Sequence, residues 1–135
     1  MYKGGCLCGC ITYEVAEFVE NSFIFCHCKR CQKANGSAFT SSISVRADDF
    51  KITKGQEFIK AYKTVDGISR YFCVECGSPL FGKKDHIPEI IRLRLGTLDT
   101  SLEGKHKPQA HIFTAFKAQW DHISDDLPQH DEWPK

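Results

Sequence analysis

The chain is organised around the stretch Phe72-Cys73-Val74-Glu75-Cys76-Gly77-Ser78-Pro79-Leu80. Two cysteines separated by two residues can direct both sulfurs toward one tetrahedral metal ion. The glycine directly after the second cysteine allows the backbone N–H groups to turn toward the sulfurs. The alternative for such a pair is a redox couple, which needs strands alternating with helices, and the sequence lacks that pattern. The stretch is therefore typical of one half of a zinc site.

The remaining six cysteines lie in two groups upstream, and their spacing also indicates metal binding. Cysteines only one or two residues apart do not readily bridge each other, because a disulfide requires a specific separation of the Cα and Cβ atoms. A closed structural zinc site needs four protein ligands, whereas a catalytic site has three. We assign four cysteines to a structural zinc, namely Cys6, Cys8, Cys73 and Cys76. We assign three more to a second zinc, which would be the catalytic one, namely Cys26, Cys28 and Cys31.

The fourth position of the second site has several candidate protein ligands. His27, Cys10 or the distant His111 would make this site structural as well. In an extended segment, His27 would point away from the cysteines on either side of it. Cys10 is left over from both sites. We interpret it as a small buried residue on the first strand, although its spacing from Cys6 and Cys8 leaves the role open.

The apolar residues follow a period close to two, which is typical of half-buried strands. Ile11, Tyr13 and Val15 alternate with polar residues, and Asp66-Gly67 marks a hairpin turn. We predict one all-β, mainly antiparallel domain over residues 1–135. The expected strands cover residues 11–15, 39–45, 58–63, 68–73, 79–82, 90–95 and 111–116. Short helical turns are expected at residues 31–35, 47–50 and 98–102.

The composition is that of an ordinary folded domain, with 41% hydrophobic and 26% charged residues among 135. A net charge of +1 provides no electrostatic footprint for nucleic acid or for an anionic membrane surface. No stretch approaches the roughly 20 apolar residues of a membrane span, and the first residues lack the apolar run of a secretory leader. Together with the metal-like cysteine spacing, these features predict a cytoplasmic protein.

Several motifs follow one another along the chain. They are Gly4-Gly5-Cys6-Leu7-Cys8-Gly9, Cys26-His27-Cys28-Lys29-Arg30-Cys31-Gln32-Lys33, Gly36-Ser37-Ala38-Phe39, the stretch 72–80, His111-Ile112-Phe113, Trp120 and Asp125-Asp126-Leu127-Pro128. In this order they resemble the glutathione-dependent formaldehyde-activating enzyme family, which is related to the centromere protein V domains. The resemblance implies a β-tent of stacked sheets, with a structural and a catalytic zinc on the cysteines assigned above. It also implies carbon–sulfur lyase chemistry, in which formaldehyde and glutathione condense to S-hydroxymethylglutathione or the adduct is cleaved. Cys10 departs from the family pattern.

Residues beside the second cysteine group are candidates for binding such a substrate. A zinc with a free position can bind a thiol and lower its pKa, while the carboxylates of glutathione need cationic partners. The candidates are Lys29, Arg30 and Lys33 for the carboxylates, Gln32 and Ser37 for hydrogen bonds, and Phe39 for the pocket wall. The alternatives are a solvated cluster of loop charges and a core position for Phe39.

Two other functions fit parts of this pattern. The first is a non-catalytic zinc module that binds a thiol or a partner protein, because a fold does not imply a function. The second is nucleic-acid binding, which the near-neutral charge disfavours. The sequence does not determine the oligomeric state.

We predict about two zinc ions per chain, because seven thiols exceed the capacity of one tetrahedral site. Elemental analysis of protein purified without chelator measures this ratio. A ratio of one would contradict two filled sites.

Overall fold

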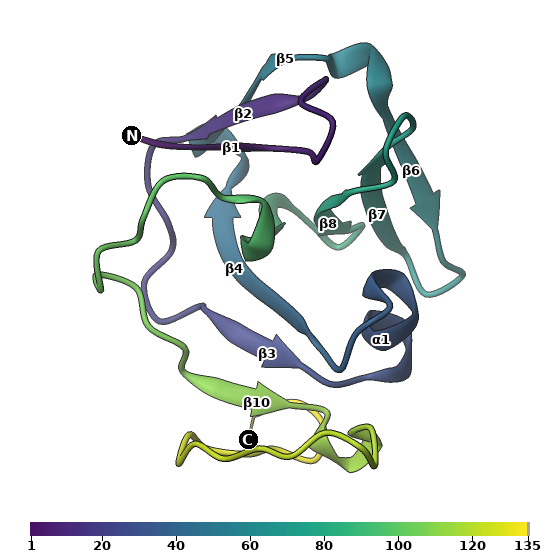
Figure 1. Ribbon diagram of the computed structural model, residues 1–135, viewed down its shortest axis with the longest axis vertical. Coiled ribbons are helices and arrows are strands. Elements are labelled where there is room, and N and C mark those ends of the chain that lie inside the picture. Colours follow the sequence, from purple (N-terminus) through teal and green to yellow (C-terminus); the bar gives the residue numbers. More distant parts are fainter. Residues whose placement is uncertain (135) are drawn as a thin grey trace.

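The computed structural model describes residues 1–134, which consist mainly of β-strands (Figure 1). The strands are β1 (Tyr2–Gly5), β2 (Thr12–Val15), β3 (Ile24–Cys26), β4 (Thr40–Arg46), β5 (Phe50–Lys54), β6 (Ile59–Lys63), β7 (Ile68–Cys73), β8 (Pro79–Lys84), β9 (Ile87–Arg94) and β10 (Ala110–Ile112). The helical elements are the α-helix α1 (Lys29–Asn35) and the short 3-10 turns η1 (Ala47–Asp49), η2 (Gln56–Phe58), η3 (Leu95–Thr97) and η4 (Thr114–Phe116). The predicted all-β class is confirmed.

The strands form two sheets. A three-stranded sheet has the order β1-β2-β5, and a seven-stranded sheet has the order β10-β3-β4-β9-β8-β7-β6. Neighbouring strands are antiparallel except for β10, which pairs with β3 in parallel. Figure 1 shows the β1–β2 hairpin at one end of the molecule and β10 with the C-terminal segment at the other.

The pairing of β4 with β9 gives the large sheet two chemically different faces. Ile43 lies opposite Leu93, and Val45 lies opposite Ile91. All four side chains are buried in the core. Because successive residues of a strand point to opposite faces, Ser42 and Ser44 of β4 and the arginines of β9 face away from this core. This second face lines the cavity described below.

Two predicted features of the local chain are confirmed. Ile11, Tyr13 and Val15 are all buried, with at most 1% of each residue exposed. The β6–β7 hairpin turns at residues 64–67, where the φ of Gly67 is 80°. A φ in this range favours glycine, which has no Cβ to collide with the backbone.

Other sequence expectations are corrected. Strands β1, β3 and β5 were not predicted, and Cys10 lies in the loop between β1 and β2 rather than on a strand. The predicted strand at 111–116 ends at Ile112, because Phe113 adopts a φ of 56° and η4 follows. The predicted turn at 98–102 is not helical. Its N-terminal part pairs with β1 instead, and the N–H groups of Asp99 and Thr100 donate to the carbonyl of Lys3.

We predict that Gly4→Ala destabilises the protein by about 1–3 kcal/mol, the usual cost of overpacking. A Cβ at Gly4 would collide with the carbonyl oxygen of Thr97 and with the Tyr13 hydroxyl. Gly96→Ala is the matched control, because a Cβ there meets nothing within 4 Å. Urea unfolding midpoints compare the two variants. Equal midpoints would contradict the proposed crowding at Gly4.

Candidate functional site

Four cysteines from distant parts of the chain meet where the β1–β2 loop approaches the turn between β7 and β8. They are Cys6, Cys8, Cys73 and Cys76, and their sulfurs all lie within 4.8 Å of one another. Cys6 Sγ accepts a hydrogen bond from the N–H of Ile11 at 3.3 Å. Four sulfurs at this separation could hold one tetrahedral metal ion. Such an ion would join the small sheet to the large one.

The turn that carries Cys73 and Cys76 has the geometry expected after a paired-cysteine motif. Gly77 has a φ of 77°, and its N–H donates to the carbonyl of Cys73 at 2.8 Å. Ser78 Oγ accepts a hydrogen bond from the N–H of Leu7 at 2.9 Å and lies 3.2 Å from Cys76 Sγ. This contact with the Ser78 side chain lowers the pKa of Cys76 to about 5. Cys76 is thereby favoured as a thiolate, which is the form that binds metal.

The second group consists of Cys26, Cys28 and Cys31, whose sulfurs also lie within 4.8 Å of one another. Cys26 ends β3, and Cys28 is the N-cap of α1, with its Sγ accepting a hydrogen bond from the N–H of Cys31 at 3.3 Å. Hydrogen bonds from Cys26 and Cys28 hold the pKa of Cys31 well below its ordinary value. The group therefore favours a thiolate at Cys31 and has a donor set that suits zinc.

The sequence candidates for a fourth ligand do not join this group. Among residues 1–134, neither His27, His111 nor Cys10 belongs to a cysteine cluster. His27 is fully buried, and its Nε2 lies 2.8 Å from Nδ1 of His111, so the two rings bind each other. Cys10 is a free thiol that packs at the edge of the core. The protein donors of the second group are thus the three sulfurs.

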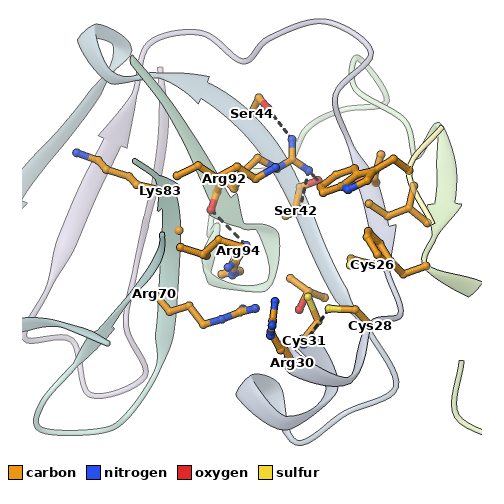
Figure 2. Close-up of a pocket in the computed structure, with 18 of the residues that line it drawn as sticks. Cys26, Cys28, Arg30, Cys31, Ser42, Ser44, Arg70, Lys83, Arg92 and Arg94 are labelled. Atoms are coloured by element: carbon orange, nitrogen blue, oxygen red, sulfur yellow. Dashed lines mark hydrogen bonds between the residues drawn. The ribbon is translucent and has the colours of Figure 1, made fainter. Parts of the chain in front are cut away.

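A cavity of about 880 Å³ opens beside the three-cysteine group (Figure 2). Its walls come from β3, β4, β7, β8, β9 and the first turn of α1, and the aromatic residues Phe113, Phe116 and Trp133 also line it. Basic residues are concentrated here, namely Lys29, Arg30, Arg70, Lys83, Lys84, Arg92 and Arg94. The cavity therefore combines a sulfur cluster, cationic groups and an apolar surface.

Arg92 is fixed in the cavity wall by the serines of β4. Its guanidinium donates to the hydroxyls of Ser42 and Ser44 and to the carbonyls of Ser22 and Ser42. Burial, followed by the neighbouring charge of Arg94, lowers the pKa of Arg92 to about 10. The side chain therefore remains cationic at neutral pH, although its hydrogen-bonding capacity is largely used within the protein.

Arg70 and Arg94 are differently placed, because no carboxylate in residues 1–134 forms an ion pair with either of them. Figure 2 shows both side chains extending toward the cysteine side of the cavity, together with Arg30. Arg30 is paired with Asp66 in the β6–β7 turn. Arg94 fits closely against Gly82, where a Cβ would lie 2.8 Å from Arg94 Nη2. Two guanidinium groups thus remain available for an anionic ligand.

The structure brings only part of the predicted substrate set to this cavity. Lys29 and Arg30 line it, whereas Gln32, Lys33, Ser37 and Phe39 do not. Gln32 is buried, and its Nε2 donates to the carbonyls of His27 and Phe116. Phe39 is half-buried and packs against Phe25 and His27, outside the main hydrophobic core.

The two remaining candidates are exposed. Lys33 lies in the last turn of α1, and Ser37 follows the Gly36 cap of that helix. Proximity in sequence to the cysteines was therefore a poor guide to the cavity wall, since α1 turns these residues away from it.

Sequence reasoning missed Arg70, Arg92 and Arg94. For Arg92 and Arg94 the available signal was their alternation with apolar residues along a predicted strand, in Ile91-Arg92-Leu93-Arg94, whereas Arg70 follows Ser69 and has no such pattern. A charged residue between two core residues must lie on the opposite face of the sheet. The overall charge of +1 concealed this local concentration of cations.

Comparison with known proteins identifies the family of the chain and a solved structure with the same fold. The family model described as "Glutathione-dependent formaldehyde-activating enzyme" matches residues 1–116. The chain belongs to this family. A relative named "Putative glutathione-dependent formaldehyde-activating enzyme", from Penicillium rubens, is 34% identical over 92 residues. That match covers 63% of this chain and 48% of the relative, so the chain spans about half the length of the curated relative it matches.

A solved structure shares the fold of this family member. The crystal structure of a Rhodobacter sphaeroides protein superposes with a TM-score of 0.63 at 22% identity. It covers 78% of this chain and 97% of the other. No helix in residues 1–134 is long and apolar enough to cross a membrane.

We predict that Cys28→Ser and Cys76→Ser have different consequences. Serine at position 28 preserves the N-cap of α1, because serine is a preferred capping residue. This variant should stay folded and lose one zinc per chain. Cys76→Ser removes a ligand from the group that joins the two sheets and should unfold the protein.

Thermal unfolding and elemental analysis of both variants provide the measurement. If the two variants melt alike, the division into a structural and a non-structural site is wrong.

Proposed function

We propose that this protein is a zinc-dependent carbon–sulfur lyase that forms or cleaves S-hydroxymethylglutathione, or a related thiol adduct. One observation carries the proposal. The cavity has a three-sulfur cluster beside it, and two guanidiniums that have no acidic partner within residues 1–134 extend toward that cluster. Glutathione matches these features because it has a thiol and two carboxylates on one flexible chain. Membership of the family supports the same substrate.

The three-cysteine group fits zinc by the chemistry of its donors. Its sulfurs lie within 4.8 Å of one another, and hydrogen bonds from its two partners stabilise the thiolate of Cys31. A zinc ion bound there would supply a position that binds the substrate sulfur as a thiolate. With the four-cysteine group also loaded, we expect two zinc ions per chain. Eight free thiols agree with a reducing compartment such as the cytoplasm.

The protein's own residues would bind and orient the substrate. Arg70 and Arg94 would hold a carboxylate of glutathione through charge-assisted hydrogen bonds. Arg92, bonded to the serines of β4, would add a fixed positive charge to the same wall. The substrate would then be held by its carboxylate at the arginines and by its sulfur at the three-cysteine group. Because it is already oriented, it would lose less translational and rotational freedom in the reaction.

The reaction itself is balanced without an oxidant. In the forward direction, the substrate sulfur forms a bond to the carbon of formaldehyde. The C=O π bond breaks, and the proton from the thiol ends on the new hydroxyl oxygen. Phe113, Phe116 and Trp133 would limit the access of water to this adduct, since their rings line the cavity.

The test is exchange NMR of glutathione and formaldehyde with catalytic amounts of the zinc-loaded protein. We expect faster interconversion of free glutathione and S-hydroxymethylglutathione than in buffer. Binding of glutathione without faster interconversion would favour the non-catalytic thiol-binding module. Neither binding nor acceleration would contradict glutathione as the ligand.

We predict that Arg94→Gln raises the Kd of glutathione by about 10- to 100-fold, the cost of one or two charge-assisted hydrogen bonds. Arg46→Gln removes the same charge from an exposed residue outside the cavity lining and serves as the control. Calorimetric titration compares the two variants. An equal Kd for both would show that Arg94 does not bind the substrate.

A further inference from the structure

A chain of hydrogen bonds connects the C-terminal segment to the loop that carries Cys26 and Cys28. His27 Nε2 lies 2.8 Å from Nδ1 of His111, and His111 Nε2 lies 2.9 Å from Oδ2 of Asp125. Both rings are buried, with His27 fully excluded from solvent. Neither His111 nor Asp125 lines the cavity. Their side chains therefore reach the site through His27 rather than by lining the cavity.

The chemistry of the three side chains determines which atom donates and which accepts in each of these hydrogen bonds. A carboxylate can only accept hydrogen bonds, and the bond from His111 lowers the pKa of Asp125 and keeps it ionised. His111 therefore carries its proton on Nε2, and its Nδ1 accepts the Nε2 proton of His27 when both rings are neutral.

The backbone of His27 is fixed as firmly as its ring. Its N–H donates to the carbonyl of Ile112 at 3.0 Å, and its carbonyl accepts from Gln32 Nε2 at 2.8 Å. Within residues 1–134, Nδ1 of His27 is the one buried side-chain nitrogen or oxygen that has no hydrogen-bond partner. It lies 4.0 Å from Oδ2 of Asp121, beyond hydrogen-bonding range. The remaining polar atoms of His27 hold it in a single orientation.

His27 lies between Cys26 and Cys28 in the sequence, so its orientation also affects these two cysteines. In an extended segment, Cys26 and Cys28 point to the face opposite His27. A rotation of His27 about the backbone would move both sulfurs together. The orientation of the Cys26–Cys28 pair thus depends on the bonds made by the ring between them.

We propose that His111 and Asp125 are positioning residues that hold Cys26 and Cys28 in the geometry of the three-sulfur metal site. This inference rests on the metal site of the proposed function but not on its substrate. Asp125 lies outside residues 1–116, which the family model matches. The C-terminal segment would then be part of the metal site's support, although it supplies none of the three sulfurs.

The test uses the full-length protein loaded with cadmium. Cadmium NMR distinguishes an ion on four sulfurs from one on three, so each site reports separately. Asp125→Ala removes both the charge and the acceptor, whereas Asp125→Asn retains an acceptor oxygen. Asp126→Ala is the matched control, because Asp126 is an exposed neighbour whose side chain makes no hydrogen bond within the described residues 1–134.

We expect Asp125→Ala to weaken metal binding at the three-sulfur site about tenfold, which is typical when an outer support of a metal site is lost. The four-sulfur resonance should remain unchanged. Asp125→Asn should recover most of the affinity, and Asp126→Ala should resemble the wild type.

Three results would overturn the inference. The first is an unchanged three-sulfur resonance in Asp125→Ala. The second is an equal loss of metal at both sites, which would indicate general destabilisation. The third is a loss in Asp126→Ala as large as that in Asp125→Ala. If the wild-type protein shows only the four-sulfur resonance, the metal site of the proposed function fails, and this inference fails with it.

Discussion

The pairing of β4 with β9 is the constraint on which the rest of the structure depends. Because residues alternate between the two faces of a strand, one register places Ile43 and Val45 against the core and Ser42 and Ser44 beside the arginines of β9. A slip of one residue would bury the guanidiniums and expose the core. The hydrophobic core and the cationic wall are therefore two results of the same alignment.

The cysteine groups use this framework in different ways. The four-cysteine group brings together loops from the two sheets, so a metal ion bound there would hold separate parts of the chain together. The three-cysteine group is local, running from the end of β3 into α1, and it faces the cavity. Its geometry depends on packing behind it, where His27, Gln32 and the C-terminal segment share hydrogen bonds. The residues around the cavity thus come from nearly the whole length of the chain.

Much of this arrangement could be predicted from the sequence, and the failures have physical causes. Cysteine spacing alone separated the two groups, because coordination numbers restrict how thiols can be shared. Alternation located most strands, but the helical turn predicted at 98–102 does not form, because the backbone there bonds to β1 rather than to itself. The arginines that β7 and β9 contribute to the cavity wall were also missed. Arg70 and Arg94 are 24 residues apart and meet only because β7, β8 and β9 are adjacent in the sheet.

The guanidiniums of Arg70 and Arg94 make the stability of the protein depend on the anions in its buffer. Several cations held close together in a partly buried wall repel one another, and burial removes part of their hydration. For Arg70 and Arg94, no acidic side chain in residues 1–134 replaces that hydration with an ion pair. A small anion that enters the cavity relieves this repulsion and therefore stabilises the folded state by mass action. The free energy of unfolding therefore changes with the anion that the buffer contains. Phosphate or sulfate would act as a weak substitute for the substrate, and the thermal stability of the protein would depend on which anions it is stored with.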